Sequence, residues 1–339
     1  MICWLTVNRA CNMRCNWCYA KADNFSSVST MTSIVFEKIL SAISSTSIKK
    51  FILIGGEPTL HNQLPSMINR LKPAKVLLVT NAVKLADKKY LKLLIDNGLD
   101  MVTVSLKGAT EEQYKQNTGV ACLKSVEKAV ANLNDFKINY SISVTFSSSI
   151  MTTLPMVLDW MKSTNAKVMS INYCRPVVLD NKVSIKEVPH PKEMAQKTID
   201  SYEMIKSSGV RCVYNFLLPL CLLPIEFINE LLSKDLLTTV CQLQTNNGLI
   251  FMPDGNLVPC NHLFEYSLGK LGVDFNTNTE FEKFRKKDEI ISFYQKTQNL
   301  PDVRCKQCNL QKHCGGGCFI QYLQYDSSEI IIKPFIERR

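Results

Sequence analysis

Long apolar segments are absent from this sequence of 339 residues. A helix needs roughly 20 consecutive apolar residues to cross a bilayer, and the longest candidate, residues 216–228, is broken by Pro219 and Pro224. The N-terminus, Met1 to Leu5, lacks the basic and small-residue zones of a signal peptide. These absences predict a cytoplasmic protein with no membrane partner.

Long blocks of like charge are also absent. The formal net charge of +10 is spread over short pairs such as Lys49-Lys50 and Lys286-Lys287. Dispersed lysines are typical of a solvated surface, whereas nucleic-acid binding favours a concentrated basic patch. We therefore expect no nucleic-acid partner, although the charge is compatible with an acidic peptide.

Cysteine, by contrast, is abundant, with 14 residues. The cytosol keeps thiols reduced, so this number indicates metal or redox work rather than disulfides. Three cysteines form the run Cys11-x3-Cys15-x2-Cys18, with Trp17 directly before the last. Structural zinc sites close with four N or S ligands, whereas three thiolates in one loop can hold a [4Fe–4S] cluster and leave one iron open. The loop therefore predicts an open-site iron–sulfur cluster.

A second motif, Gly55-Gly56-Glu57-Pro58, directly follows a predicted buried strand at 51–54. Glycines without a Cβ let a ligand approach the backbone closely. Together the two motifs resemble the radical S-adenosylmethionine (SAM) superfamily. The resemblance implies that the open iron chelates SAM, that Gly55 to Pro58 bind its amino group, and that Trp17 belongs to the same site. The reduced cluster then cleaves SAM to a 5′-deoxyadenosyl radical, which abstracts a hydrogen atom from substrate.

Strand and helix patterns alternate through the first half of the chain. Strands are predicted at 2–8, 51–54, 75–80, 100–106, 138–146 and 167–174, with helices between them, the first capped by Thr32. Such alternation favours a parallel sheet with right-handed crossovers, here a partial (β/α)6 TIM-like barrel of α/β class. Sites in barrels lie at the C-terminal ends of strands. With the family resemblance, this gives further SAM-contact candidates: Thr80, Asn81, Ser105, Lys107 and Ser143.

We divide the chain into the barrel at 1–180, a helical bridge at 181–240 and a cysteine-rich domain at 241–339. The bridge is expected to contain helices at 193–207 and 225–237. The last domain holds Cys241-x13-Gly255-x4-Cys260 and then Cys305-x2-Cys308-x5-Cys314-x3-Cys318. A β-hairpin predicted between residues 249 and 258 would bring Cys241 and Cys260 together.

This second constellation resembles the SPASM domain of radical SAM enzymes, which carries two auxiliary [4Fe–4S] clusters. The resemblance implies that Cys241, Cys260 and Cys318 hold auxiliary cluster I, and that Cys305, Cys308 and Cys314 hold auxiliary cluster II. The family pattern has a seventh cysteine, but none follows Cys318 here. Cluster II then has another ligand, an open iron, or is absent; Cys305 to Cys318 could also close a zinc site. The oxygen and nitrogen candidates for cluster II are Asp326, Glu329 and His313. For the missing fourth ligand of cluster I the candidate is Cys221, and a buried free cysteine is the alternative.

SPASM-bearing enzymes are often maturases of ribosomally made peptides. The resemblance implies a precursor-peptide substrate and a reductant such as flavodoxin or ferredoxin. Because the chain starts at its first barrel strand, we expect peptide recognition by a separate protein or by the enzyme surface. Two auxiliary clusters favour an oxidative crosslink (thioether, carbon–carbon or ether). Epimerisation is the alternative, with a thiol hydrogen donor at Cys174, which ends the sixth strand, or at Cys221.

Other classes fit less well. Sulfatase maturases that generate formylglycine carry an aspartate base directly after the Gly-x4-Cys cysteine, where this chain has Asn261. Small-molecule radical SAM dehydrogenases often hold a single auxiliary cluster. An iron–sulfur electron carrier would not need the Gly-Gly-Glu-Pro motif. The remaining cysteines, Cys3, Cys122 and Cys212, are predicted to be core residues.

Overall fold

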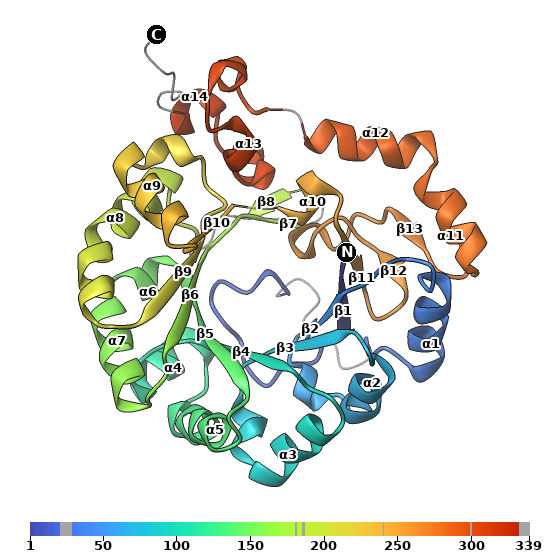
Figure 1. Ribbon diagram of the computed structural model, residues 1–339, viewed down its shortest axis with the longest axis horizontal. Helices are drawn as coiled ribbons and strands as arrows, with labels where there is room; N and C mark the ends of the chain where they lie inside the picture. The colour runs from blue at the N-terminus through green and yellow to red at the C-terminus, as the bar shows by residue number, and fades with distance from the viewer. Residues whose placement is uncertain (21–28, 180–181, 185–186, 240, 299, 332–339) are drawn as a thin grey trace.

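The computed structural model describes residues 1–20, 29–179, 182–184, 187–239, 241–298 and 300–331. Its main sheet is a curved wall with helices on the outside (Figure 1). Neighbouring strands β1 to β6 pair in parallel and in sequence order. Their bounds are Ile2–Asn8, Lys50–Gly55, Lys75–Thr80, Met101–Leu106, Asn139–Phe146 and Val168–Tyr173. The predicted α/β barrel is therefore confirmed.

The helices that connect these strands follow the expected pattern. They are α1 (Ser33–Ala42), α2 (Leu64–Arg70), α3 (Lys88–Asp96), α4 (Glu111–Thr118), α5 (Leu123–Asp135), α6 (Ser148–Met151) and α7 (Leu154–Ser163). Thr32 caps α1 as predicted, because its side chain accepts a hydrogen bond from the Val35 amide. In α5 the buried residues Val126, Ala129, Val130 and Leu133 recur at helical spacing and face the sheet.

The bridge differs from its prediction in one respect. It contains the expected helices α8 (Pro191–Ser207) and α9 (Ile225–Ser233), but it also contains β9 (Arg211–Asn215) and β10 (Leu237–Thr238). Strand β9 pairs in parallel with β6, and β10 pairs with β9, so both extend the barrel wall. A purely helical bridge was wrong. Short strands with polar ends lack the apolar run that identifies a buried strand.

The C-terminal segment extends the other edge of the sheet. Strand β11 (Gly248–Phe251) pairs in parallel with β1, and it forms the predicted hairpin with β12 (Asn256–Leu257). Strand β13 (Gly269–Lys270) completes this edge. Helices α11 (Asn278–Arg285) and α12 (Asp288–Thr297) lie outside it, while α13 (Gln311–Cys314) and α14 (Ser327–Ile330) lie near α9 (Figure 1). The remaining elements are α10 (Gln242–Thr245) and the small hairpin of β7 (Val177–Leu179) and β8 (Lys182–Ser184).

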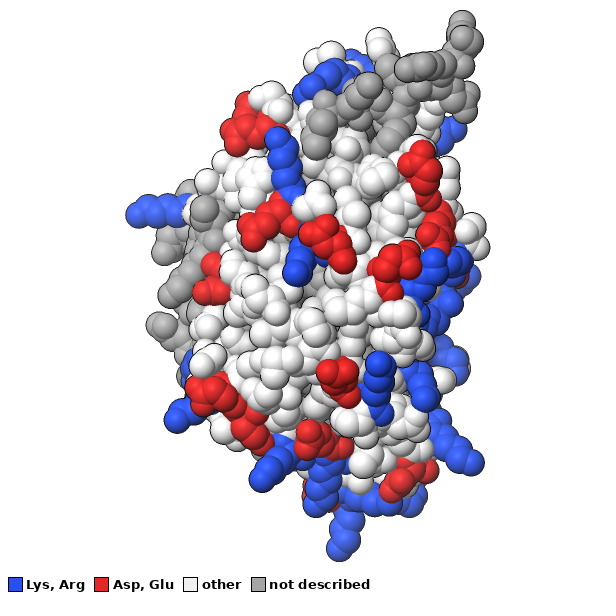
Figure 2. Space-filling view, turned by 90° about the vertical axis from the view of Figure 1, so that its left-hand side faces the viewer, with Lys and Arg blue, Asp and Glu red and all other residues white. Residues whose placement is uncertain are grey.

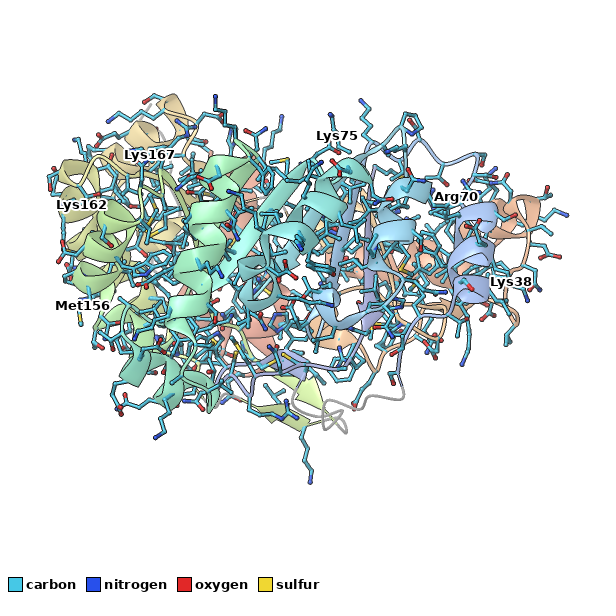
Figure 3. The ribbon with its side chains drawn as sticks, turned by 90° about the horizontal axis from the view of Figure 1, so that it is seen from below. Lys38, Arg70, Lys75, Met156, Lys162 and Lys167 are labelled. Carbon is cyan, nitrogen blue, oxygen red and sulfur yellow. The ribbon has the colours of Figure 1, made fainter. Side chains whose placement is uncertain are left out.

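The sheet and its helices share one apolar core, to which Cys3, Cys122 and Cys212 belong as predicted. Within the described ranges, no helix has both the length and the apolar character needed to cross a membrane. Acidic and basic side chains are interspersed on the face seen in Figure 2. In Figure 3, Lys75 at the start of β3 and Lys167 just before β6 lie along the same edge of the molecule. They mark the N-terminal ends of the strands, so the C-terminal ends open on the opposite side.

Candidate active site

A cavity of about 500 Å³ opens at the C-terminal ends of the barrel strands. Its wall includes Gly55 from β2, Thr80 from β3, Ser105 from β4, Ser143 from β5 and Asn172 from β6. Parallel barrels carry their sites at this end because the strand ends and the following loops converge there. The cavity is therefore the candidate active site.

The cysteine loop after β1 forms part of this wall. The thiols of Cys11, Cys15 and Cys18 all line the cavity. The Met13 amide donates to Cys11 Sγ and the Ala20 amide to Cys18 Sγ, each over 3.4 Å. The two amides therefore donate hydrogen bonds to sulfurs in the cavity wall, and such bonds stabilise a thiolate.

The end of α4 fixes the same loop from outside. The Arg14 amide donates to the Thr118 carbonyl over 2.8 Å, and the Asn16 amide donates to the Asn117 carbonyl over 2.9 Å. Thr118 and Asn117 are buried. The loop is thus held by the protein on its outer side and presents its sulfurs to the cavity.

Burial disfavours the thiolate forms of Cys11 and Cys18 when no metal is bound. Burial, with smaller contributions from Glu57 and the neighbouring thiols, raises the pKa of Cys11 to about 12, although the hydrogen bond from the Met13 amide opposes the increase. Burial and Cys15 likewise raise the pKa of Cys18. Iron binds thiolates, so metal binding must replace these protons and gives the buried sulfurs a charge partner. The donor set and its position fit a [4Fe–4S] cluster.

Glu57 is a structural centre of the site. Its carboxylate is 1% exposed and accepts from the Thr59 amide (3.1 Å), the Thr59 hydroxyl (2.7 Å), the Thr80 hydroxyl (2.6 Å) and the Asn81 amide (2.7 Å). Burial raises the pKa of Glu57, and these four donors oppose the increase. The Asn81 side chain then donates to Asn12 Oδ1 over 2.7 Å. Glu57 therefore connects the end of β3 to the cysteine loop.

The two glycines before Glu57 serve the same loop. A Cβ on Gly56 would lie 2.3 Å from the Ala10 carbonyl oxygen, and one on Gly55 would lie 2.4 Å from Asn8 Oδ1. The Glu57 amide donates to the Ala10 carbonyl over 2.7 Å. The sequence prediction attributed the glycine pair to close approach of a ligand; the structure also shows close approach of the cysteine loop.

The other predicted SAM contacts are distributed around the cavity. Thr80, Asn81, Ser105, Lys107, Ser143 and Trp17 line it, together with Gly55, Gly56 and Glu57. The Lys107 ammonium lies 5.7 Å from the Trp17 ring centre. Pro58 is buried at the start of a 3-10 turn and is not among the described residues that line the cavity. Its position shapes the turn after Glu57.

The first auxiliary set of thiols reaches the same cavity from the C-terminal segment. Cys241 and Cys260 line it, and Cys318 is buried next to them, 3% exposed. Burial raises the pKa of Cys260 to about 12; Arg175 opposes this, and Cys318 and Cys241 add to it. The structure thus brings together the three thiols that the SPASM resemblance assigns to cluster I.

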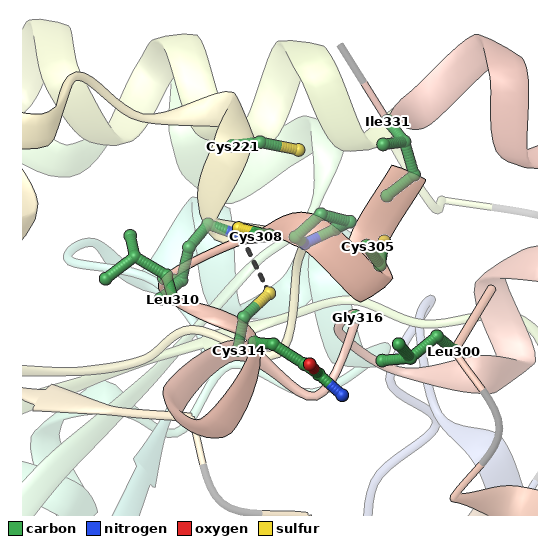
Figure 4. Close-up of a pocket in the computed structure, with 11 residues that line it drawn as sticks. Cys221, Leu300, Cys305, Cys308, Leu310, Cys314, Gly316 and Ile331 are labelled. Atoms are coloured by element: carbon green, nitrogen blue, oxygen red, sulfur yellow. Dashed lines mark hydrogen bonds between the residues drawn. The ribbon is translucent and has the colours of Figure 1, made fainter. Parts of the chain in front are cut away.

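Cys221 lies elsewhere. The sequence analysis placed it with cluster I or in the role of hydrogen donor, but it lines a separate pocket with the thiols of Cys305, Cys308 and Cys314 (Figure 4). Cys221 lies in the 3-10 turn Leu220–Leu222, and this turn contacts the C-terminal segment because the Leu220 amide donates to Cys314 Sγ over 3.2 Å. Among the described residues, no three His, Cys, Asp or Glu side chains converge as they would around a single metal ion. This differs from the tetrahedral zinc arrangement considered from the sequence.

Cys174 does reach the barrel cavity. It follows β6, is 4% exposed and lines the cavity beside Arg175. Burial raises the pKa of this thiol to about 12. It therefore stays a neutral S–H group at ordinary pH.

Sequence reasoning missed Arg175, His262 and Tyr19, which line the cavity between the two thiol sets. The Tyr19 and His262 rings lie 5.1 Å apart. Burial and the nearby Arg175 lower the pKa of His262 to about 3, so its imidazole is neutral. The signals available were position alone: Arg175 follows Cys174, and His262 lies two residues after Cys260.

Comparison with known proteins shows what the first half of the chain resembles. Residues 5–162, which hold both the cysteine loop and the Gly-Gly-Glu-Pro motif, match the radical SAM superfamily. Members of that superfamily use a [4Fe–4S] cluster and SAM, and the residues around this cavity fit both.

The relatives found by sequence similarity differ from the proteins that share the fold. A probable GTP 3′,8-cyclase of Thermococcus kodakarensis is 33% identical over 144 residues, covering 41% of this chain and 46% of that protein. One of Methanococcus maripaludis is 27% identical over 266 residues, covering 76% and 83%. The chain spans about half the length of the first of these curated relatives.

Solved structures share the fold along nearly the whole chain. The structure of anSMEcpe with bound AdoMet has a TM-score of 0.71 at 20% identity and covers 98% of this chain and 93% of its own. Streptococcus suis SuiB bound to the precursor peptide SuiA has a TM-score of 0.72 at 14% identity and covers 96% and 73%. At these identities the likeness establishes the fold.

Proposed function

We propose that this protein is a radical SAM peptide maturase that forms an oxidative crosslink in a ribosomally made peptide. The observation that carries the proposal is the single cavity that has Cys11, Cys15 and Cys18 in its wall together with Cys241 and Cys260. The SAM-binding loop and an auxiliary site would face the same substrate space. We also propose the SPASM assignment of residues 241–339 on this ground.

The cysteine loop and the C-terminal thiols on the cavity wall have different roles in this proposal. A cluster and SAM held at the cysteine loop would supply the radical chemistry that removes a hydrogen atom from substrate. Glu57, Asn81 and the glycine pair hold that loop in place through the contacts described above. A crosslink removes two electrons from the peptide, so a second redox-active group beside the substrate is needed. The thiols of Cys241 and Cys260 provide the place for one.

The charge of the cavity favours a substrate with few charges. Among the described residues in its wall, the charged side chains are Glu57, Lys107 and Arg175. Glu57 is fully engaged by its hydrogen bonds. The rest are aromatic, aliphatic, thiol or neutral polar groups, which suit a peptide segment. Relatives of the same fold have been solved with peptides, namely anSMEcpe with Cp18Cys and SuiB with SuiA.

Epimerisation remains the alternative within this class because Cys174 places a neutral thiol on the cavity. Formylglycine formation is less favoured, since Asn261 lies in the cavity wall at the position where the sulfatase maturases have a carboxylate base. An amide cannot accept a proton at neutral pH. We propose a flavodoxin or ferredoxin as reductant and a separate protein for peptide recognition.

A second candidate function is the one named for the sequence relatives, GTP 3′,8-cyclase. It is favoured by sequence identity over the barrel. A triphosphate, however, would place several negative charges against the two basic side chains of the cavity wall. The two substrates can be separated in one assay.

That assay measures release of 5′-deoxyadenosine from SAM by the anaerobically reconstituted protein. A short peptide encoded beside its gene should increase release and incorporate its own deuterium into 5′-deoxyadenosine when labelled, whereas GTP should not. Deuterium transfer from labelled GTP, with no response to peptide, would establish the cyclase instead. The variant with Cys11, Cys15 and Cys18 replaced by Ala controls for background cleavage.

A further inference from the structure

The second thiol pocket is separate from the barrel cavity and shares no lining residue with it. It has a volume of about 20 Å³ and is lined by Cys221, Cys305, Cys308 and Cys314 with leucine side chains around them (Figure 4). Four thiols around one apolar pocket are the donor set of a fully ligated iron–sulfur cluster.

Backbone contacts bring Cys221 to this pocket from far along the chain. The Leu220 amide donates to Cys314 Sγ over 3.2 Å, the contact drawn in Figure 4. The Cys318 amide donates to the Leu217 carbonyl over 2.7 Å. Two hydrogen bonds thus join the segment around Cys221 to the segment that carries the last two cysteines.

Glycine makes this close approach possible. Gly317 has a φ of +80°, and a Cβ there would lie 2.8 Å from the Pro219 backbone nitrogen. Any other residue would push the Cys221 segment away from the pocket. Close packing of the two segments therefore explains the glycine at position 317, the last of the Gly315 to Gly317 run.

The other three thiols come from a compact, internally hydrogen-bonded segment. The Cys308 amide donates to the Cys305 carbonyl over 3.1 Å, and the Cys314 amide donates to the Leu310 carbonyl over 2.8 Å. Cys221 and Cys308 both lie near enough to Cys305 to affect its ionisation, and Cys221 likewise affects Cys314. All four cysteines line the same pocket.

We propose that Cys221 is the fourth thiolate ligand of a cluster held by Cys305, Cys308 and Cys314. It replaces the cysteine that the SPASM pattern has after Cys318, although Cys221 precedes the other three ligands in the sequence. When a cluster binds, the four thiols would release their protons to solvent. The proposal concerns iron binding and does not depend on the identity of the substrate.

The other ligands considered from the sequence have different positions. Asp326 caps α14, where it accepts from the Ser328 amide over 2.8 Å. Neither Asp326, Glu329 nor His313 is among the described residues that line this pocket. The two sets of thiols therefore differ in number. The set in this pocket has four, whereas Cys241, Cys260 and Cys318 are three.

The test compares the anaerobically reconstituted wild-type protein with Cys221→Ala and Cys221→Val. We expect either a loss of about four irons per chain or, after mild oxidation, about one additional three-iron paramagnetic centre per chain by electron paramagnetic resonance. Cys314→Ala should cause the same change. Cys212→Ala, a buried cysteine in the barrel core, is the matched control and should change neither quantity.

Valine is close to cysteine in size and has no atom that can bind iron, so Cys221→Val decides the matter where the alanine variant does not fold. An iron content and an oxidised spectrum identical to wild type in a folded Cys221 variant would overturn the assignment. Loss of iron in Cys314→Ala together with wild-type iron in Cys221→Val would place the fourth ligand elsewhere.

Discussion

Replacing Glu57 by Gln should loosen the cysteine loop at a single contact. In the wild type one carboxylate oxygen accepts from Thr59 and Thr80, and the other accepts from the Asn81 amide over 2.7 Å. A glutamine can keep its carbonyl toward the first group, but its NH2 then faces the Asn81 N–H. The change removes a hydrogen bond to a charged group and leaves a buried donor unpaired, which costs roughly 1.5–3 kcal/mol. Relief of the buried charge offsets part of this cost, since burial raises the pKa of Glu57.

The expected net destabilisation is about 2 kcal/mol, or a decrease of roughly 3–6 °C in the thermal midpoint. Because Asn81 also binds Asn12, SAM cleavage should fall more than stability alone explains. The assays are thermal unfolding at one scan rate and 5′-deoxyadenosine release at a temperature where both proteins are folded. Glu37→Gln, at an exposed ion pair with Arg70, is the control. A midpoint and a cleavage rate equal to wild type would refute the role given to Glu57.

Two further changes act on the same loop. Gly56→Ala should displace the cysteine loop, because its Cβ would lie 2.3 Å from the Ala10 carbonyl oxygen; overpacking of this kind costs roughly 1–3 kcal/mol, and SAM binding by equilibrium dialysis should weaken. Gly209→Ala is the control: it has a φ of +76°, so alanine brings backbone strain there, but its Cβ meets nothing within 4 Å and it lies between α8 and β9, outside the cysteine loop and the cavity wall. Equal SAM affinity in both variants would contradict the steric argument. Replacing Cys11, Cys15 and Cys18 together by Ala should abolish SAM cleavage while auxiliary iron stays bound, and retained turnover would contradict the placement of the catalytic cluster.

Local sequence signals predicted the barrel well because its strands and helices obey simple periodicities. The strands at 2–8 and 75–80 have the predicted bounds. Strand β9 was missed because only Cys212 and Tyr214 of its five residues are buried, and its ends are polar. A strand this short is defined by pairing with β6, which no local pattern reveals.

Motif spacing predicted which residues would meet within one segment, but not across segments. Cys11, Cys15 and Cys18 lie in one loop, so their spacing alone brings them together. Cys221 was predicted to join Cys241, Cys260 and Cys318, but it lines a pocket with Cys305, Cys308 and Cys314, because its position depends on a packing contact between Pro219 and Gly317. Arg175 and His262 were missed because they reach the cavity from two separate segments, which no single motif spans.

We propose above that this protein oxidises a peptide, and the mass of that peptide reports the oxidation directly. The measurement is mass spectrometry of a short peptide encoded beside the gene, co-expressed with the protein under anaerobic conditions. The account predicts a loss of about two mass units for each crosslink, in keeping with the removal of two hydrogen atoms. A peptide of unchanged mass in ordinary water that gains about one unit in deuterated water would instead indicate epimerisation, with Cys174 as hydrogen donor. No change in either solvent, with GTP consumed by the same protein, would contradict the account.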